Sequence, residues 1–454
     1  MSGPFRRILV ANRGAAASRI IRAVRALGAS PVAVYSEADA NAFYLEQADE
    51  AHPLGAAPVR SSYLNQDALI DLIEARNIDA VHPGYGFLSE NAEFARRVVE
   101  AGATFIGPSP QHIADLGYKT TARERMKALG VSMGPSSGVL HTYEEALAEA
   151  GRIGYPVLMK PAGGGGGSGI TAAHSAEELR AAFDRLNAKA GQNFGLAGLY
   201  LEKLVVRPRH VEFQMLADRH GNIRCLFDRD CSVQRRHQKV IEEAPAPKLP
   251  AEARSRMADE VTSALGRMGY DSIGTVETLY SAADGFGFLE VNTRLQVEHA
   301  VTEEITGIDL VQSQIRLAAG ETLDTVLPEN VEVDGWAVEA RIYAEDPLTF
   351  RPSPGRLETF RLATGEGIRI ETGYREGDTI TPHYDPMIAK VVAWGPDREA
   401  ARRRLLKSVE ETVISGPKTN LGFITATLDH PEFVAGNLRT DLAEDVLKMM
   451  RRAA

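Results

Sequence analysis

Six glycines in seven positions, at 163 to 169, lie between two short apolar segments near the middle of the chain. Glycine has no side chain to keep an anion away from the backbone amides, and it adopts backbone conformations that other residues avoid. Lys160 ends the apolar segment before the run, and Pro161 favours an extended backbone at Lys160. Bare amides beside a strand-end lysine predict a flexible cover over the phosphates of a nucleotide.

Three other interpretations of the glycine run fit less well. A flexible linker would be flanked by polar, structureless sequence, whereas strand-like segments lie on both sides of this run. A Rossmann turn needs a helix directly after its glycines, and five consecutive glycines match its pattern trivially. A Walker loop needs Gly-Lys followed by Ser or Thr, which this run does not contain. The interpretation that remains is a phosphate cover that hinges between two strands.

Composition indicates the class of protein. The 454 residues, 44% hydrophobic and 25% charged, are typical of a globular chain with two to four domains. A net charge of −10 argues against a general nucleic-acid binder, which is normally basic. The sequence shows no signal-peptide core, no apolar stretch long enough to span a membrane, and only two cysteines, Cys225 and Cys231. We therefore expect a cytoplasmic protein that binds neither nucleic acid nor membrane and has no disulfide framework.

Short apolar segments alternate with helical patterns in the first part of the chain. The segments that predict strands are 8–11, 31–35, 79–81 and 103–107. This alternation predicts an α/β fold with a parallel sheet covered by helices on both faces, ending near residue 115. The turn after the first strand has a single glycine, Gly14, so the dinucleotide-binding fingerprint is absent there.

The rest of the chain predicts two further domains. Residues 132–204 predict a small mobile lid of helices and strands around the glycine run. Beyond it we expect a hairpin of 209–217 with 223–228, a helix over 251–268, and strands at 272–281 and 286–291. After about residue 335 the pattern is again mixed strand and helix. The predicted domains are 1–115, 116–331 with the lid at 132–204, and 332–447.

The strands at 272–281 and 286–291 suggest a metal site. Glu290 and Asn292 flank Val291, so strand alternation places them on one face, and a hairpin partner can bring Glu277 opposite them. Two carboxylates and an amide oxygen are hard ligands that suit Mg²⁺ on nucleotide phosphates. A solvated polar face is the usual fate of such residues, but here the other face is apolar and a phosphate loop needs a metal.

Two further segments concentrate charge. Residues 230–239 include Arg235, Arg236, His237 and Lys239 in what we expect to be a short loop, and residues 294–299 directly follow the proposed metal strand. A basic run in an acidic protein usually forms a solvated face, but it can also bind an anion.

Four segments of the chain are similar to a known family. They are Asn12-Arg13-Gly14, the run HPGYGFLSEN at 82–91, residues 234–239 with EEAP at 242–245, and residues 290–299. These segments resemble biotin carboxylase, of the ATP-grasp superfamily, and the similarity extends from about residue 5 to 445. The resemblance implies an ATP-grasp fold with an N-terminal parallel-sheet (Rossmann-like) domain, a small mobile lid and a C-terminal mixed α+β lobe. It also implies a ligase that carboxylates biotin with ATP, Mg²⁺ or Mn²⁺, and bicarbonate, through carboxyphosphate.

The resemblance also implies a role for individual residues. The nucleotide would be bound by Lys119, Lys160, Gly165, Gly166, Gly167, Glu202, Lys203, Leu204, Val205, His210, Gln234 and His237. The metal ligands would be Glu277, Glu290 and Asn292. Bicarbonate would be held by Lys239, Arg294, Gln296 and Val297. Glu298 would be the general base, and Arg341 would face the ureido oxygen of biotin.

The chemistry explains why these residue types are needed. Bicarbonate is a weak nucleophile, so a carboxylate base such as Glu298 must raise its negative charge as it attacks the γ-phosphorus. Lys239 and Arg294 offset the repulsion between two anions, and the planar fork of arginine fits an oxyanion. Arg341 would stabilise the charge that develops on biotin. Cys231 and His299 lie inside these motifs without an assigned role, and we expect them to serve in packing or orientation.

The chain departs from the family pattern at four positions. Ala15 replaces a glutamate, Ser168 replaces a cation of the glycine loop, Ala300 replaces a proline, and Asp228 is one methylene shorter than the usual glutamate. None of these changes removes a residue assigned to the metal, the base or bicarbonate. Ser168 removes a positive charge from the lid, so we expect a raised KM for ATP with intact chemistry.

Partners and alternative functions follow from the same resemblance. The sequence contains no Ala-Met-Lys-Met or Val-Met-Lys-Met motif, so we expect biotin on a separate carrier protein and a separate carboxyltransferase subunit. A homodimer is expected from the family alone. One alternative is a non-catalytic ATP-binding scaffold of a carboxylase complex, motivated by Ala15 and Ser168. Another ATP-grasp ligase ranks last, because it leaves Lys239, Arg294 and Glu298 together unexplained.

Overall fold

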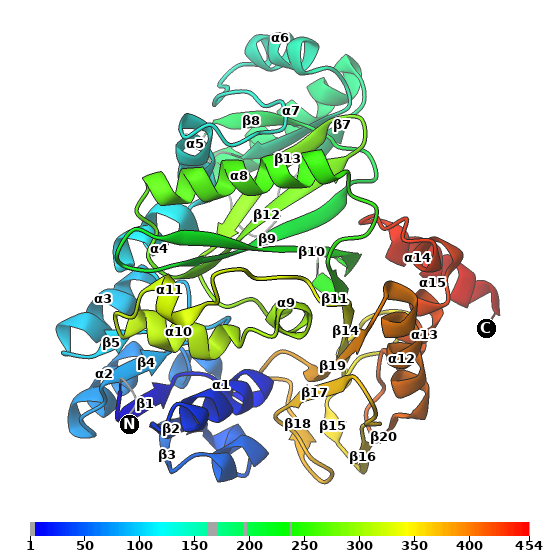
Figure 1. The fold of residues 1–454 in the computed structure, drawn as a ribbon. Coiled ribbons are helices and arrows are strands. Elements are labelled where there is room, and N and C mark those ends of the chain that lie inside the picture. The colour runs from blue at the N-terminus through cyan, green and yellow to red at the C-terminus, as the bar shows by residue number, and fades with distance from the viewer. Residues whose placement is uncertain (1–4, 162–170, 194–197, 237, 454) are drawn as a thin grey trace.

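The N-terminal domain is built on a five-stranded parallel sheet in the order β3-β2-β1-β4-β5. The protein is described by a computed structural model covering residues 5–161, 171–193, 198–236 and 238–453 (Figure 1). The strands are β1 (Arg7–Val10), β2 (Ser30–Ser36), β3 (Glu50–Gly55), β4 (Ala80–His82) and β5 (Thr104–Phe105). The helices are α1 (Gly14–Ala26), α2 (Gln66–Ala75) and α3 (Ala92–Glu100); α4 (Pro110–Gly117) and α5 (Lys119–Ala128) follow and lead into the next domain. The predicted parallel α/β sheet is confirmed.

Helices cover both faces of this sheet, as the sequence predicts. On one face the apolar side of α1, with Ile20 and Val24, packs on β1 together with α10 (Leu310–Ala318). On the other face, residues of α2 and α3 such as Phe94 form a second core with β2 and β4. Helix α3 begins after Asn91, whose side chain accepts a hydrogen bond from the amide of Phe94, satisfying a free helix-end donor.

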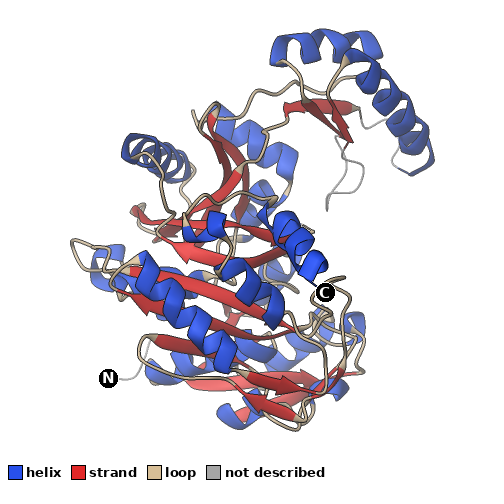
Figure 2. Ribbon diagram, turned by 90° about the vertical axis from the view of Figure 1, so that its right-hand side faces the viewer, coloured by secondary structure: helices blue, strands red, loops and turns tan. Residues whose placement is uncertain are grey.

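The lid is a separate three-stranded sheet in the order β7-β6-β8, with α6 and α7 beside it. Its elements are α6 (Tyr143–Ile153), β6 (Val157–Pro161), β7 (Thr171–Ala173), α7 (Ala176–Asn193) and β8 (Leu199–Lys203). Thr142 and Glu145 form a reciprocal capping box that fixes the start of α6. Figure 2 shows this unit standing away from the body of the molecule, as expected for a lid. The glycine run at 163–169 lies outside the described residues.

The largest element of the fold is an eight-stranded sheet in the order β13-β12-β9-β10-β11-β14-β19-β17. Its first five members are β9 (Arg209–Ala217), β10 (Ile223–Arg235), β11 (Gln238–Ala244), β12 (Ile273–Ser281) and β13 (Gly285–Asn292). Helix α8 (Ala251–Arg267) packs against one face of this sheet at β9, β10 and β13, with Met257, Val261 and Leu265 buried in the shared core. The helices that follow are α9 (His299–Thr306), α10 and α11 (Leu323–Val326).

The same sheet continues without interruption into the C-terminal lobe, because β11 pairs with β14 antiparallel. The strands of this lobe are β14 (Trp336–Tyr343), β15 (Gly355–Arg356), β16 (Thr359–Arg361), β17 (Ile368–Thr372), β18 (Thr379–Ile380), β19 (Met387–Gly395) and β20 (Val413–Ser415). Its helices are α12 (Arg398–Glu411), α13 (Leu421–Leu428), α14 (Pro431–Val434) and α15 (Leu442–Ala453). The predicted boundary near residue 332 therefore divides the chain but not the sheet.

One structural expectation is wrong. The basic segment 230–239 was expected to be a short loop, but β10 extends to Arg235 and β11 begins at Gln238, leaving only a tight turn between them. Asp230, Ser232 and Arg235 of this segment are buried, and Arg235 pairs with Glu345, so polar residues occupy interior positions of the sheet where apolar alternation is absent. Within the described residues, no helix combines the length and the hydropathy needed to cross a membrane.

Candidate active site

A cleft of about 1360 Å³ lies between the lid, the eight-stranded sheet and the C-terminal segment. Every described residue of the predicted site lines it: Lys119, Lys160, Glu202, Lys203, Leu204, Val205, His210, Gln234, Lys239, Glu277, Glu290, Asn292, Arg294, Gln296, Val297, Glu298 and Arg341. His237 and Gly165 to Gly167 lie outside the described residues. Residues from segments more than 200 positions apart in the chain are thus brought to one cavity.

Lys239 is the central cation of the cleft. Its Nζ lies 2.6 Å from Glu212 Oε2, 2.8 Å from Glu277 Oε1 and 2.6 Å from Glu298 Oε1. Burial alone would lower the pKa of Lys239, but these three carboxylates raise it well above its ordinary value. The ammonium group therefore stays charged at the bottom of the cleft.

Strand alternation explains why these groups meet. On β9, His210, Glu212 and Gln214 share the face toward the site, while Val211 and Phe213 point into the core. The register of β9 with β12 places Glu212 directly opposite Glu277. Each strand therefore contributes one polar face to the cleft and one apolar face to the interior.

Glu298 is fully buried at the N-terminal end of α9. Besides Lys239, it contacts Arg341 Nη2 at 2.9 Å through Oε2, and the Cys231 thiol at 3.6 Å. Burial would raise the pKa of Glu298, but Lys239 and Arg341 hold it well below its usual value. Glu298 is therefore an ionised carboxylate able to accept a proton from a ligand in the cleft.

Arg294 lies beside this pair and is fixed by several acceptors. Its Nε donates to Glu90 Oε2 at 3.0 Å, and its Nη atoms donate to Gln296 Oε1 at 3.0 Å and Asn292 Oδ1 at 3.2 Å. Glu90 belongs to the N-terminal domain, so this contact joins two domains across the site. The guanidinium is oriented before any substrate arrives.

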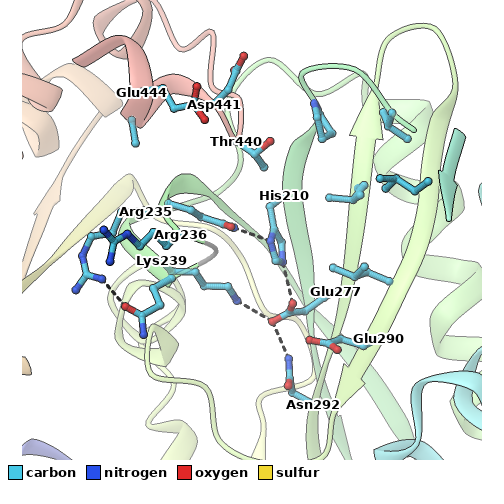
Figure 3. A pocket seen from close by; sticks show the side chains of 18 of the residues that line it. His210, Arg235, Arg236, Lys239, Glu277, Glu290, Asn292, Thr440, Asp441 and Glu444 are labelled. Carbon is cyan, nitrogen blue, oxygen red and sulfur yellow. Dashed lines mark hydrogen bonds and ion pairs between the residues drawn. The ribbon is translucent and has the colours of Figure 1, made fainter. Parts of the chain in front are cut away.

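The predicted metal ligands meet as expected from the hairpin. Glu277 pairs with Glu290 in the register of β12 and β13, and the Asn292 amide donates to Glu277 Oε1 at 2.7 Å (Figure 3). Glu277 also contacts His210 Nε2 at 2.9 Å, and Glu290 contacts Lys119 Nζ at 2.6 Å. The clustered carboxylate and amide oxygens fit a hard divalent cation such as Mg²⁺. His210, Glu212 and Glu277 also place ligand atoms within 4.8 Å of one another.

The predicted nucleotide residues line the hinge between the lid and the sheet. Lys160 and Arg123 both pair with the Glu202 carboxylate. The Lys203 ammonium donates to the carbonyl oxygens of Gly154 and Tyr155 at 3.0 and 2.9 Å. The Gln234 amide lies 2.7 Å from His210 Nδ1. The cations predicted to meet phosphates are thus paired with carboxylates of the same cleft.

Sequence reasoning missed four charged residues that shape the site. Glu212 and Arg229 form a fully buried pair behind Lys239, Glu90 orients Arg294, and Arg123 shares Glu202. The alternating polar run at 210, 212 and 214 within an otherwise apolar strand was the available signal for Glu212. Glu90 lies within the segment HPGYGFLSEN, which carries the family resemblance without a role for this residue, and Arg229 gave no comparable local signal.

The described departures from the family pattern are accommodated structurally. Asp228 lies 2.9 Å from Arg254 and accepts a hydrogen bond from the amide of Ala246. Ala300 is buried where α9 packs on β11 and β14, and Ala15 is buried in the first turn of α1. Ser168 lies outside the described residues.

Family models match nearly the whole chain. Residues 4–113 match the biotin carboxylase N-terminal domain, 118–326 the ATP-binding domain of the carbamoyl-phosphate synthase L chain, and 339–445 the biotin carboxylase C-terminal domain.

Full-length relatives and solved structures agree with the family models. A biotin carboxylase of Halalkalibacterium halodurans is 46% identical over 446 residues, covering 98% of both chains. Biotin carboxylase 2 of Bacillus subtilis is 45% identical, covering 98% of this chain and all of that protein. The biotin carboxylase domain dimer of Hydrogenobacter thermophilus 2-oxoglutarate carboxylase, solved with MgADP, ADP and bicarbonate, is 43% identical, with a TM-score of 0.90 over 98% of each chain. The parallel N-terminal sheet, the lid and the carboxylate-lined cleft are therefore those of an ATP-grasp ligase, and the chain belongs to the biotin carboxylase family.

Proposed function

We propose that this chain carboxylates biotin on a separate carrier protein, and that Glu298, Lys239, Arg294 and Arg341 perform the chemistry. The observation that supports these roles best is the pair of contacts at Glu298: Lys239 on Oε1 and Arg341 on Oε2. Because Glu298 is buried and ionised, it is available to take a proton in the first step. Arg341, which contacts the same carboxylate, is placed to stabilise the negative charge on biotin in the second step.

In the first step, Glu298 accepts the proton of bicarbonate as the bicarbonate oxygen attacks the γ-phosphorus of ATP, which yields carboxyphosphate and ADP. Lys239 and Arg294 offset the repulsion between the two anions. Gln296 and the backbone of Val297 complete the bicarbonate site. Because Arg294 is already oriented by Glu90, it can receive the oxyanion without reorganising.

Lys119, Lys160 and His210 face the phosphates of ATP in this proposal. Glu277, Glu290 and Asn292 would hold Mg²⁺ or Mn²⁺, which neutralises phosphate charge when bound. The hinge residues Glu202 to Val205 hold the adenine, and Gln234 and His237 line the nucleotide site. Since Lys119 is paired with Glu290 and Lys160 with Glu202, binding of metal nucleotide must exchange these contacts.

In the second step, carboxyphosphate decomposes to CO₂ and phosphate, the phosphate takes the N1′ proton of biotin, and the N1′ anion attacks CO₂ to form carboxybiotin, while Glu298 returns its proton to solvent. Arg341 stabilises the negative charge on the ureido oxygen. A biotin carboxyl carrier protein delivers the biotin, and a carboxyltransferase subunit selects the final acceptor. We also propose a homodimer, supported by the dimeric domain of the Hydrogenobacter thermophilus relative, and a cytoplasmic location.

Release of ADP from ATP in the presence of free biotin, with and without bicarbonate, tests this function. We expect ADP release that requires bicarbonate and is stimulated by biotin. ATP binding without bicarbonate-dependent release would instead support the non-catalytic scaffold. Bicarbonate-dependent release that biotin does not stimulate, with transfer to another acceptor, would indicate a different ATP-grasp ligase.

A further inference from the structure

Four charged residues occupy the middle of the eight-stranded sheet beneath the active site. Glu242 on β11 stands opposite Glu339 on β14, and Arg341 on β14 stands opposite Lys390 on β19. All four are buried, with Glu242 and Glu339 completely inaccessible and Lys390 only 1% exposed. Their neighbours on the same strands, such as Ile241 and Val391, belong to an apolar core.

One half of this group reaches the side chain of Glu298. Arg341 Nη2 lies 2.6 Å from Glu242 Oε1 and 2.9 Å from Glu298 Oε2, so a single nitrogen joins the two carboxylates. Burial raises the pKa of Glu242 and Arg341 opposes that shift, whereas Glu298 is held ionised by Lys239 and Arg341. Glu242 therefore anchors Arg341 from behind while Glu298 and the cleft lie in front of it.

The other half reaches the backbone beside Glu298. Lys390 Nζ donates to the carbonyl oxygen of Val297 and lies 3.4 Å from Glu339 Oε2. Val297 precedes the base and is part of the proposed bicarbonate site. Lys390 thus fixes the peptide that joins the bicarbonate site to the base, and Glu339 fixes Lys390.

A purely structural purpose explains this arrangement poorly. Buried ion pairs are expensive to desolvate, and apolar residues of similar size usually serve stability as well or better. Here the cation of each pair also contacts one of two adjacent site residues: Lys390 contacts Val297, and Arg341 contacts Glu298. The two cations come from different strands, β19 and β14. This convergence suits precise placement of a site more than it suits packing of a sheet.

We propose that Glu242, Glu339 and Lys390 are positioning residues for the carboxylation reaction: Lys390 and Glu339 set the Val297–Glu298 peptide for bicarbonate, and Glu242 sets Arg341 for biotin. None of the three needs to touch substrate. The inference rests on the proposed function for the identity of the ligands, but not for the geometry.

The first test is the variant Lys390→Met, which keeps the length of the side chain but removes the donor to Val297. We expect the Kd of bicarbonate, titrated calorimetrically in the presence of MgADP, to rise at least about tenfold, while the KM for ATP changes less than about twofold. Lys390→Arg, which keeps the charge and a donor, should recover part of the affinity. Because Lys390→Met leaves Glu339 unpaired, the double variant Lys390→Met/Glu339→Gln provides a second form that is better able to fold.

The matched control is Glu243→Gln. Glu243 neighbours Glu242 on β11 and is equally buried, but it bonds Arg398 at 2.7 Å and Trp336 at 2.8 Å, away from Val297. We expect this variant to lose stability and to keep its affinity for bicarbonate. The assignment of Lys390 would be overturned if folded Lys390→Met kept the wild-type Kd for bicarbonate, or if Glu243→Gln lost as much affinity for bicarbonate as Lys390→Met. It would also be overturned if neither the single nor the double variant folded.

Glu242→Gln tests the biotin half. We expect the KM for free biotin to rise or the biotin-stimulated rate to fall at least about tenfold, with the bicarbonate Kd unchanged. Equal loss of both would show that Glu242 supports only the fold. A wild-type protein that binds bicarbonate but does not release ADP would contradict the proposed function alone, because the titration reports positioning without turnover. A wild-type protein that does not bind bicarbonate would contradict both.

Discussion

Lys239 and Glu298, which are 59 positions apart in the chain, form a 2.6 Å ion pair inside the cleft. The pair joins the β10–β11 hairpin to the start of α9, and Glu212 and Glu277 share the same ammonium group. A base and a cation are thus in contact before substrates bind, so bicarbonate would enter a site whose charges are already arranged.

The first prediction concerns Glu298. Replacing it with glutamine keeps the size and the contact to Lys239 but removes the proton acceptor. We expect Glu298→Gln to reduce bicarbonate-dependent ADP release by about 10²- to 10⁴-fold, the usual contribution of a general base. Binding of ADP, measured calorimetrically, should remain within about threefold of wild type. Turnover near the wild-type rate would exclude Glu298 as the base.

The metal prediction concerns Glu290. Glu290→Gln removes one anionic oxygen from the site formed with Glu277 and Asn292. We expect the Mg²⁺ concentration for half-maximal ADP release to rise at least about tenfold, since even residues that only support a metal ligand have effects of that size. Glu304→Gln, which removes a carboxylate bonded to Arg369 outside the cleft, serves as the control. Equal Mg²⁺ dependence of both variants would contradict the ligand assignment.

Much of this site could be predicted from the sequence because strand alternation is local. The positions of Glu277, Glu290 and Asn292 on facing strands follow from a two-residue period and one hairpin turn. The extension of β10 to Arg235 could not be predicted, because its polar residues are buried through ion pairs with distant partners such as Glu345. Hydrophobic periodicity cannot reveal burial of that kind.

The sequence also does not show which distant segments of the chain pair with one another. The contact of Glu212 with Lys239 and the pairing of β11 with β14 depend on segments separated by tens of residues. Local propensity does not specify which distant strands become neighbours. The continuous sheet beneath the two predicted domains, and the charged group of Glu242, Glu339, Arg341 and Lys390 within it, became visible only in the structure.

A stability prediction follows from Arg229. This arginine is completely buried and donates to Glu212 at 2.5 Å and to Gln214 and Thr302 at 2.8 Å. Arg229→Met removes the donor to Glu212 Oε1, Gln214 and Thr302 inside the core, so we expect the free energy of unfolding in urea to fall by about 3–5 kcal/mol. Arg60→Met, at an exposed position, should change it by less than about 0.5 kcal/mol. Similar stabilities of the two variants would show that the buried arginine is dispensable.

The lid gives a prediction based on sequence. Ser168 stands where the family pattern has a cation in the glycine loop. We expect Ser168→Arg to lower the KM for ATP, because the added charge can meet phosphate, while kcat stays within about twofold. Ser168→Gln, which adds length without charge, should leave the KM near the wild-type value. An unchanged KM in Ser168→Arg would contradict the explanation.

Glu371 provides a pH-dependent prediction for stability. Its carboxylate is buried beside Arg369, which lies at 2.8 Å, and also pairs with Arg22. Burial alone would raise the pKa of Glu371, but the two arginines lower it from 4.5 to about 2. A folded-state pKa below the unfolded value means that Glu371 stabilises the fold above about pH 4.5 and loses this contribution as the pH falls toward 2. Glu371→Gln cannot titrate, so the difference in unfolding free energy between wild type and variant should shrink by about 0.8 kcal/mol between pH 7 and pH 4. Urea unfolding at fixed protein concentration measures this difference, and a constant value across that range would show that the pKa of Glu371 is not lowered on folding.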